Sequence, residues 1–249
     1  MKRLGLIDVL SLSLDSLRNQ PSLIFPLFSL SLLSFFIFSF VFGRPSSAQE
    51  LVERIPELLA KNLNQLLVVI TILYLFMVGG ASIVCGMTKV GIARGSSSIT
   101  EGLQEAEKHV FSVIVAFIIA GFISGILLIG GIIAVTQIIS ETGIFSALSY
   151  AFVILLSFMM GILFLYALPA IIIDELDSIT AIGLSIGIVL NHLKDSLILA
   201  FLALLSLFIS YYCSSFLSGA LHFLFLLIAA SLVLTLLVIA ISVDYVNLK

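Results

Sequence analysis

The chain has 249 residues, of which 61% are hydrophobic and 10% are charged, and its formal net charge is −3. Soluble domains carry about a quarter charged residues, so this composition excludes an ordinary water-soluble domain. The small net charge gives no reason to expect a nucleic-acid partner. We expect an all-α fold, because backbone hydrogen bonds must be satisfied within helices when the chain lies in lipid.

Six apolar stretches are long enough to cross a bilayer, whose hydrocarbon core requires about 20 apolar residues. They cover residues 22–42, 65–90, 110–139, 148–173, 196–217 and 220–243. If the N-terminus is cytoplasmic, eight lysines and arginines lie on the inner side of the membrane and three on the outer side. This bias predicts a multi-pass protein of the cell membrane with both termini in the cytoplasm.

A short amphipathic helix is expected before the first span, over residues 4–18. One of its faces is apolar and is formed by Ile7, Leu10, Leu14 and Leu17. The other face carries Asp8, Ser11, Asp15 and Arg18. A helix with two such faces lies in the membrane interface rather than across the bilayer. It should end before Pro21, because the residue that precedes a proline avoids helical backbone angles.

Residues 43–64 form the only sizeable loop expected on the outer side, and the segment 46–64 within it is the part whose structure stays open. Its charged and apolar residues alternate as in a helix, but it also contains Pro56. Proline is poorly tolerated inside a helix and well tolerated in a first turn. Two interpretations stay open: a separate outer helix that is kinked at Pro56, or the start of a long helix that continues into the second span.

Two more amphipathic helices are expected on the cytoplasmic side. One begins at Ser98, which forms a Ser-x-x-Glu capping box with Glu101. The other follows the acidic turn at residues 174–177 and begins near Ser178. Both start with the tripeptide Ser-Ile-Thr. We predict a candidate interaction surface on the apolar stripe of the last helix, formed by Ile179, Ile182, Ile186 and Leu190.

These three amphipathic helices each precede a pair of predicted spans. The layout predicts a single membrane domain over residues 1–249 with a threefold repeat, in the segments 4–95, 96–175 and 176–249. The second and third segments share Ser-Ile-Thr, whereas the first shares only the layout. Chance together with membrane topology would also produce helical hairpins of this kind.

Two short pieces of the chain carry a resemblance to a known family. They are Leu17-Arg18-Asn19-Gln20-Pro21 and the segment 169–175, which is followed by Ala181 and Ser185. The chain resembles the six-span membrane domain found ahead of some glycerophosphodiester phosphodiesterases, and related uncharacterised bacterial and archaeal multi-pass proteins. That domain has an Asn-x-Pro-like turn before its first span. It also has a late proline in span four, an acidic turn and an Ala-x-x-x-Ser helix.

The resemblance implies a six-span helical fold and no enzymatic activity. The hydrolytic activity of those phosphodiesterases belongs to a separate catalytic domain, and this sequence contains no such domain. The turn also differs slightly, because Gln20 separates Asn19 from Pro21.

The sequence offers few groups for chemistry. No predicted span carries a charged residue near its middle, which argues against an ion-coupled transporter. The motifs HExxH and GxSxG are missing, so no enzyme is expected. The histidines and cysteines share no metal-ligand spacing, so no metal or cofactor is expected; they are His109, His192, His222, Cys85 and Cys213. The two cysteines are expected to be small packing residues.

Two local motifs concern helix packing. Gly121-x-x-x-Gly125 in the third span is a signal for close helix approach. Pro169 lies late in the fourth span, where it removes one backbone hydrogen bond and is predicted to kink the helix. That kink is either purely structural or also shapes a cavity or gate.

The leading hypothesis is a non-enzymatic integral membrane protein that acts as a platform or accessory subunit. Its partners would be the lipid bilayer and a protein bound at the cytoplasmic face. The alternative is an uncoupled carrier or channel for a lipid-like or small apolar solute, and an intramembrane enzyme ranks third. A membrane-spanning cavity lined by Thr136, Gln137 or Tyr166 would favour the carrier.

Overall fold

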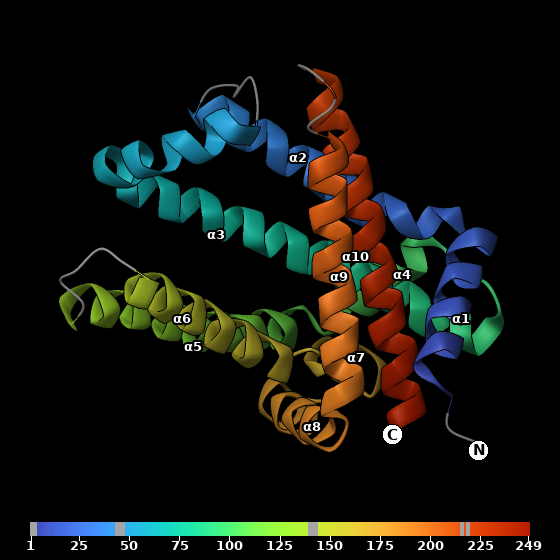
Figure 1. The fold of residues 1–249 in the computed structure, drawn as a ribbon. Coiled ribbons are helices and arrows are strands. Elements are labelled where there is room, and N and C mark those ends of the chain that lie inside the picture. Colours follow the sequence, from blue (N-terminus) through green and yellow to red (C-terminus); the bar gives the residue numbers. More distant parts are fainter. Residues whose placement is uncertain (1–3, 43–47, 139–143, 215–216, 218–219) are drawn as a thin grey trace. The chain divides into compact units, whose positions relative to one another are not determined.

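The computed structural model describes residues 4–42, 48–138, 144–214, 217 and 220–249. Every element of regular secondary structure in these residues is a helix, and they include no strand, which confirms the all-α class. Two compact units are present: Met1–Lys108 with Phe201–Lys249 form unit 1, and His109–Ala200 form unit 2. This division does not follow the predicted repeat boundaries, and the repeat stays a prediction. Figure 1 shows the helices of both units.

Within the described residues, four helices are long and apolar enough to cross a membrane, or five if α4 (Ile99–Lys108) and the start of α5 (Val110–Ile138) count together as one bent span. The four are Pro21–Val41, Thr71–Arg94, Leu193–Ser214 and Leu221–Leu248. The fold is therefore compatible with membrane insertion, but not all six predicted spans are confirmed. The fourth predicted span is interrupted, because α6 (Ile144–Leu163) and α7 (Ala167–Ile173) are separate helices.

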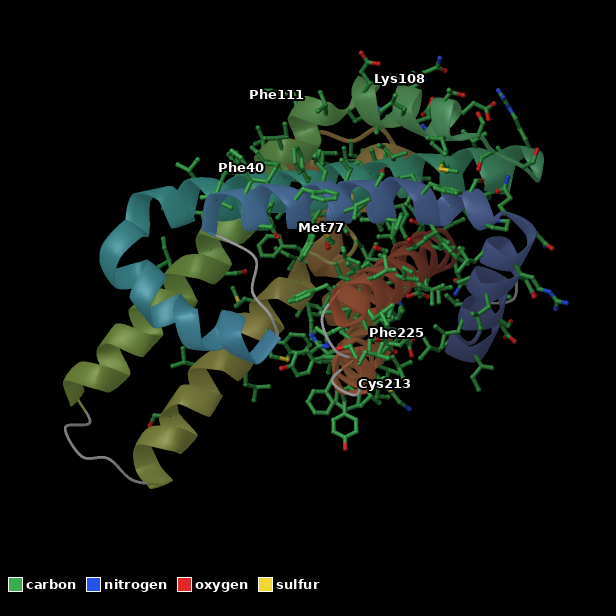
Figure 2. All side chains as sticks on the ribbon, turned by 90° about the horizontal axis from the view of Figure 1, so that it is seen from above. Phe40, Met77, Lys108, Phe111, Cys213 and Phe225 are labelled. Atoms are coloured by element: carbon green, nitrogen blue, oxygen red, sulfur yellow. The ribbon has the colours of Figure 1, made fainter. Side chains whose placement is uncertain are left out.

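Unit 1 is built from α1 (Leu6–Asn19), η1 (Pro21–Ile24), α2 (Phe25–Phe42), α3 (Ala48–Arg94), α4 (Ile99–Lys108), the second part of α9 (Leu193–Ser214) and α10 (Ala220–Leu248). Helices α2 and α10 pack on each other and on α3, while α1 packs on α10 and α4 packs on α3. Buried apolar side chains fill the space between them, including Leu27, Val84, Met87 and Ile239. Phe40, labelled in Figure 2, is 91% exposed, as expected of a side chain that faces lipid.

From Ala48 onward, the outer segment is continuous with the second predicted span, and residues 46 and 47 lie outside the described residues. Helix α3 runs without interruption from Ala48 to Arg94, over 47 residues, so this segment is not a separate helix. Pro56 therefore lies inside the long helix and beyond its first turn. Of the two interpretations, the long helix that continues into the span is the one observed.

Unit 2 contains α5 (Val110–Ile138), α6, α7, α8 (Ser178–Asn191) and the first part of α9 (Leu193–Ser214). Helices α5 and α6 pair, and α8 packs on α5, α6 and α7. A Cβ added at Gly131 would lie 2.6 Å from Val153 Cγ1, so a glycine is needed for this close approach. At Gly125 a Cβ would meet nothing within 4 Å. The predicted packing role of Gly121-x-x-x-Gly125 is therefore wrong for Gly125.

Helices α1, α4 and α8, called the amphipathic helices below, share a pattern that the sequence did not reveal. Their N-cap residues are Gly5, Ser98 and Asp177. In each amphipathic helix the fourth and the eighth residue after the N-cap are buried. They are Val9 and Ser13 in α1, Gly102 and Ala106 in α4, and Ala181 and Ser185 in α8. Large apolar side chains on other faces stay outside, as at Ile7, which is 82% exposed. The eighth residue after the N-cap is small in all three helices, and α4 buries small residues only, whereas α1 also buries Leu17 and α8 also buries Ile188 and Val189.

Candidate functional site

The predicted interaction surface lies along α8, and its four residues are called the α8 apolar stripe. At its two ends, Ile179 is 76% exposed and Leu190 is 64% exposed. Between them, Ile182 and Ile186 are half-buried. The stripe is thus a real outward face whose ends, rather than its middle, offer most of the accessible apolar area.

The opposite face of α8 holds this helix in unit 2 through hydroxyl groups. The side chains of Ala181, Ser185 and Val189 are fully buried. Ser178, at the start of the helix, donates a hydrogen bond to the carbonyl oxygen of Ser112 in α5 at 2.9 Å. A buried hydroxyl that finds a backbone partner avoids the cost of desolvation without a hydrogen bond. This face therefore fixes how α8 is rotated, and it leaves the apolar stripe outside.

Ser185 also bridges the break between α6 and α7. Its hydroxyl donates to the carbonyl oxygen of Leu163 at 2.7 Å and accepts from the amide of Tyr166 at 3.0 Å. These are two of the backbone groups that an interrupted helix leaves without helical partners. One buried side chain thus satisfies both ends of the interruption.

Pro169 is the third residue of α7, and the break precedes it by about one turn. In a continuous helix the proline ring would clash with the carbonyl group of Leu165, four residues earlier. The chain instead tightens, with the Phe164 amide bonded to the carbonyl oxygen of Gly161 and the Leu165 amide to that of Ile162. Pro169 itself is buried. The break is therefore located where proline chemistry requires it.

Tyr166, one of the residues expected to line a cavity, is fully buried at this break. Its hydroxyl oxygen accepts a hydrogen bond from Ser196 in α9 at 3.3 Å. Packed and bonded in this way, Tyr166 helps to close the break. The side chains of Thr136 and Gln137, the other two residues named for such a cavity, lie outside the described residues.

The acidic turn before α8 supplies its helix cap. Asp177 accepts hydrogen bonds from the amides of Ile179 at 3.0 Å and Thr180 at 3.1 Å, and from the Thr180 hydroxyl at 2.6 Å. The bond from the Thr180 hydroxyl contributes most to lowering the pKa of Asp177 below its usual value. Glu175 is exposed and adopts a left-handed backbone conformation, with φ of 58°. Negative charge therefore stands at the start of the α8 apolar stripe.

Helix α4 is held on α3 in a different way. A Cβ at Gly86 would lie 2.7 Å from the carbonyl oxygen of Gly102, so the two backbones are almost in contact. Beside this crossing Lys89 pairs with Glu105 at 2.7 Å, and Glu105 also pairs with Lys108, which Figure 2 labels. The hydrogen bonds from Lys108 and then Lys89 lower the pKa of Glu105 to about 2. The predicted capping box of α4 is confirmed by the bonds between Ser98 and Glu101.

The described residues contain no group of three histidine, cysteine or acidic side chains that could hold a metal ion. The two cysteines are free. Cys85 is buried, as expected of a packing residue, whereas Cys213 is exposed, so the expectation was wrong for Cys213. The arrangement around α8 can therefore hold and present a helix face, and we assign no reaction to it.

Two residues that matter most here were not singled out as site residues by sequence reasoning. Ser185 appeared only as part of the Ala-x-x-x-Ser resemblance, and Gly102 was not noted at all. Both lie on the buried face of an amphipathic helix and four residues from another small residue, Ala181 or Ala106. Small residues at this spacing are the signal that could have identified them.

No protein-family model, curated protein or solved structure matches this chain. The resemblance to the membrane domain of glycerophosphodiester phosphodiesterases therefore stays a prediction.

Proposed function

We propose that this chain is a non-enzymatic integral membrane protein that acts as a platform for a protein partner, with the α8 apolar stripe as the contact. The observation that carries the proposal is the way α8 packs. This helix buries Ala181 and Ser185 and leaves the larger Ile179 and Leu190 outside. Exposed apolar side chains on a firmly held helix are typical of surfaces that bind another helix.

The charge around α8 favours a protein over the bilayer as the occupant of this stripe. Helices that bind the surface of an anionic membrane carry lysine and arginine on their polar face. The sequence of α8 contains neither, and the exposed Glu175 and Asp177 precede it. The partner that fits is an apolar helix with basic residues close to one end.

The same proposal includes six spans, two cytoplasmic termini and a threefold repeat. The shared burial of the fourth and eighth residues in the three amphipathic helices supports the repeat. So does a cyclic order of packing: α4 packs on α3, α8 packs on α7, and α1 packs on α10, the last helix of the chain. Each amphipathic helix thus packs on the helix that would end the preceding repeat.

The topology can be tested with the native cysteines. A membrane-impermeant maleimide added to intact cells should label Cys213, because this exposed cysteine lies one residue before the end of the candidate span Leu193–Ser214, and it should leave the buried Cys85 unlabelled. Labelling of Cys213 only after the cells are opened would contradict two cytoplasmic termini.

The platform proposal is tested by replacing the two exposed ends of the stripe. The full chain is purified from its native membranes in mild detergent, and proteins bound at stoichiometric amounts are identified by native mass spectrometry. The double variant Ile179→Asp, Leu190→Asp should lose a protein that the wild type retains. The control Ile7→Asp changes a residue on α1 that is more exposed than either of these two, and this variant should retain the protein. Equal retention by both variants would overturn the proposal.

The second candidate is an uncoupled carrier or channel for a lipid-like or small apolar solute. The observation that favours it is the break between α6 and α7, because discontinuous helices line the binding sites of many transporters. The Ser185 hydroxyl is hydrogen-bonded to the amide of Tyr166 and the carbonyl oxygen of Leu163, so these backbone groups are not available to bind a solute. Transfer of a fluorescent lipid between the leaflets of protein-containing vesicles, faster than in empty vesicles, would favour the carrier.

A further inference from the structure

A second feature, in unit 1, is independent of the α8 apolar stripe. A cavity of about 230 Å³ lies where the end of α1, the turn into η1 and the end of α3 meet, with Val243 of α10 also in its wall. Water occupies about 30 Å³ per molecule in the liquid, so the cavity has room for several heavy atoms. It is smaller than most pockets for drug-sized ligands, which measure roughly 300–1,000 Å³. A ligand of the size of a lipid headgroup fits a cavity of this volume.

Five polar side chains line the cavity, namely Asp15, Ser16, Asn19, Gln20 and Thr88. Asp15 contributes a carboxylate, and within the described part of the chain no cation pairs with it. Ser16 donates its hydrogen to the carbonyl oxygen of Leu12, and Thr88 donates to that of Val84, both at 2.8 Å. Their oxygens are left with lone pairs directed elsewhere. Asp15, Ser16 and Thr88 therefore supply three acceptors to one cavity, whereas the side-chain amide of Gln20 is bonded to Ser97.

Three helix ends meet at the cavity: two are C-termini, and one is the N-terminus of η1, which begins after Gln20. Helix α1 ends at Asn19 and α3 ends at Arg94, and both Asn19 and the adjoining Gly95 line the cavity. The C-terminus of a helix carries roughly half a negative charge. The Arg94 guanidinium does not neutralise this field at the wall, because it pairs with Glu101 at 3.0 Å and does not line the cavity. The cavity therefore favours a cation.

The wall also contains apolar side chains, which include Leu12, Leu23 and Ile92. Leu12 and Ile92 are also exposed at the surface of unit 1. A ligand that suits such a wall has a cationic end for the acceptors and an apolar part for the leucine and isoleucine side chains. A primary ammonium carries three donors, which matches the three acceptors.

We infer that this cavity binds a primary ammonium group, and that the group is supplied by the aminoethyl headgroup of a phospholipid. The amphipathic α1 would then hold a specific lipid at the point where it joins the first span. Choline headgroups have the same charge but no N–H donor, so they should bind less well. A free soluble amine has the same ammonium chemistry but lacks the apolar part.

The test uses the full chain in detergent, with native mass spectrometry of lipid adducts. Phosphatidylethanolamine and phosphatidylcholine with the same acyl chains are offered in equal amounts. The wild type should retain the ethanolamine lipid about tenfold better, a difference of ~1.4 kcal/mol. Equal retention of the two lipids would overturn the inference.

Two pairs of variants assign the preference to the cavity. Asp15→Asn removes the charge, whereas Glu107→Gln removes an exposed charge from α4, outside the cavity. Gly91→Leu fills the cavity, whereas Gly91→Ala should fit, because its Cβ would meet only Gln20 Oε1 at 3.7 Å and Ser97 Oγ at 3.9 Å. The first member of each pair should lose the tenfold preference and the second should keep it.

Two further measurements complete the test. The melting temperature of each variant is recorded in the same detergent, and Gly91→Leu provides a second route to the result if Asp15→Asn does not fold. Preference that persists in a folded Asp15→Asn or Gly91→Leu variant would overturn the inference. Ethanolamine alone is then added at the same concentration as the lipid. If it displaces the lipid completely, the amine is the whole ligand and the assignment to a phospholipid is wrong.

Discussion

The amphipathic helices α4 and α8 start with the same tripeptide, Ser-Ile-Thr, but use it differently. In α4 the serine is the N-cap, and Ser98 accepts a hydrogen bond from the amide of Glu101. In α8 the cap is Asp177, so Ser178 is the first helical residue and donates to the carbonyl oxygen of Ser112 in α5. The tripeptide is shifted by one residue relative to the helix start.

The two helices are also attached by different forces. Helix α4 depends on the close approach of Gly86 and Gly102 and on charged side chains around Glu105. Helix α8 depends on buried hydroxyl groups, with Ser185 at the centre. Steric fit and buried hydrogen bonds respond differently to substitution, and surface ion pairs respond to pH. These differences between α4 and α8 predict four effects of decreasing size.

The largest effect is expected where the backbones of α3 and α4 cross. In Gly102→Ala the new Cβ would lie 2.3 Å from Met87 Cγ and 2.7 Å from the carbonyl oxygen of Ile83, so α4 must move away. Such overpacking should lower the free energy of unfolding by about 3 kcal/mol. Urea titration in detergent micelles measures this.

The matched control is Gly183→Ala in α8, where a Cβ would meet nothing within 4 Å. Because alanine favours a helix more than glycine does, this variant should gain up to about 1 kcal/mol. If both variants lost the same free energy of unfolding, steric contact at the α3–α4 crossing would not explain the sensitivity of α4 to substitution.

The second effect concerns the hydroxyl that bridges α6 and α7. Ser185→Ala leaves the amide of Tyr166 and the carbonyl group of Leu163 without this partner in a buried place. The free energy of unfolding should fall by about 2 kcal/mol, as for other buried groups that lose a hydrogen bond. Amide exchange at Tyr166 should also become faster, which hydrogen-exchange mass spectrometry detects.

The control for Ser185 is Ser11→Ala, since the exposed Ser11 hydroxyl only donates to the carbonyl oxygen of Asp8 within α1. It should change stability by less than about 0.5 kcal/mol. If Ser185→Ala were equally mild, the bridge would not be a main support of α8.

The third effect depends on pH. Because the folded pKa of Glu105 is lowered to about 2 from 4.5, its stabilising contribution is complete above pH 4.5 and is lost as the pH falls towards 2. The contribution should be only about 1 kcal/mol, because water screens a pair in which Lys89 is 22% exposed and Lys108 is 58% exposed. Urea titrations of wild type and Glu105→Gln at pH 6 and pH 3 measure it.

At pH 6 the wild type should be the more stable of the two proteins, and at pH 3 the difference should shrink. The variant Glu107→Gln, which changes an exposed neighbour, should follow the wild type at both pH values. A difference between wild type and Glu105→Gln that does not change with pH would contradict the role of the ionised carboxylate.

The smallest effect is expected at the cap of α8. Asp177→Ala removes the acceptor for the amides of Ile179 and Thr180, so these two amides should exchange faster while the rest of α8 is unchanged. Asp177→Asn keeps an acceptor and should exchange almost as slowly as the wild type. Faster exchange along the whole of α8 would mean that the cap, rather than the buried serine face, holds the helix.

Much of the local structure followed from the sequence. Apolar runs predicted the long helices, and the amphipathic pattern predicted short ones close to α1, α4 and α8. The capping box of Ser98 and Glu101 was predicted correctly, because a cap depends only on residues three apart in the chain. The apolar stripe from Ile179 to Leu190 was identified in the same way. These features are set by neighbouring residues and by the period of the helix.

The tertiary structure decided which face of each amphipathic helix is buried. A stripe of isoleucines suggests a packing face or a binding face equally well, and only the surroundings of Ser185 and Ala181 choose between them. At the break before Pro169, the backbone groups of Leu163 and Tyr166 are hydrogen-bonded by Ser185, which comes from another helix, α8. The need for a glycine at position 102 arises from the close approach of the backbone at Gly86, which lies sixteen residues earlier in the chain. Such contacts join positions whose distance in space is absent from the order of the residues, and helical periodicity carries no information about them.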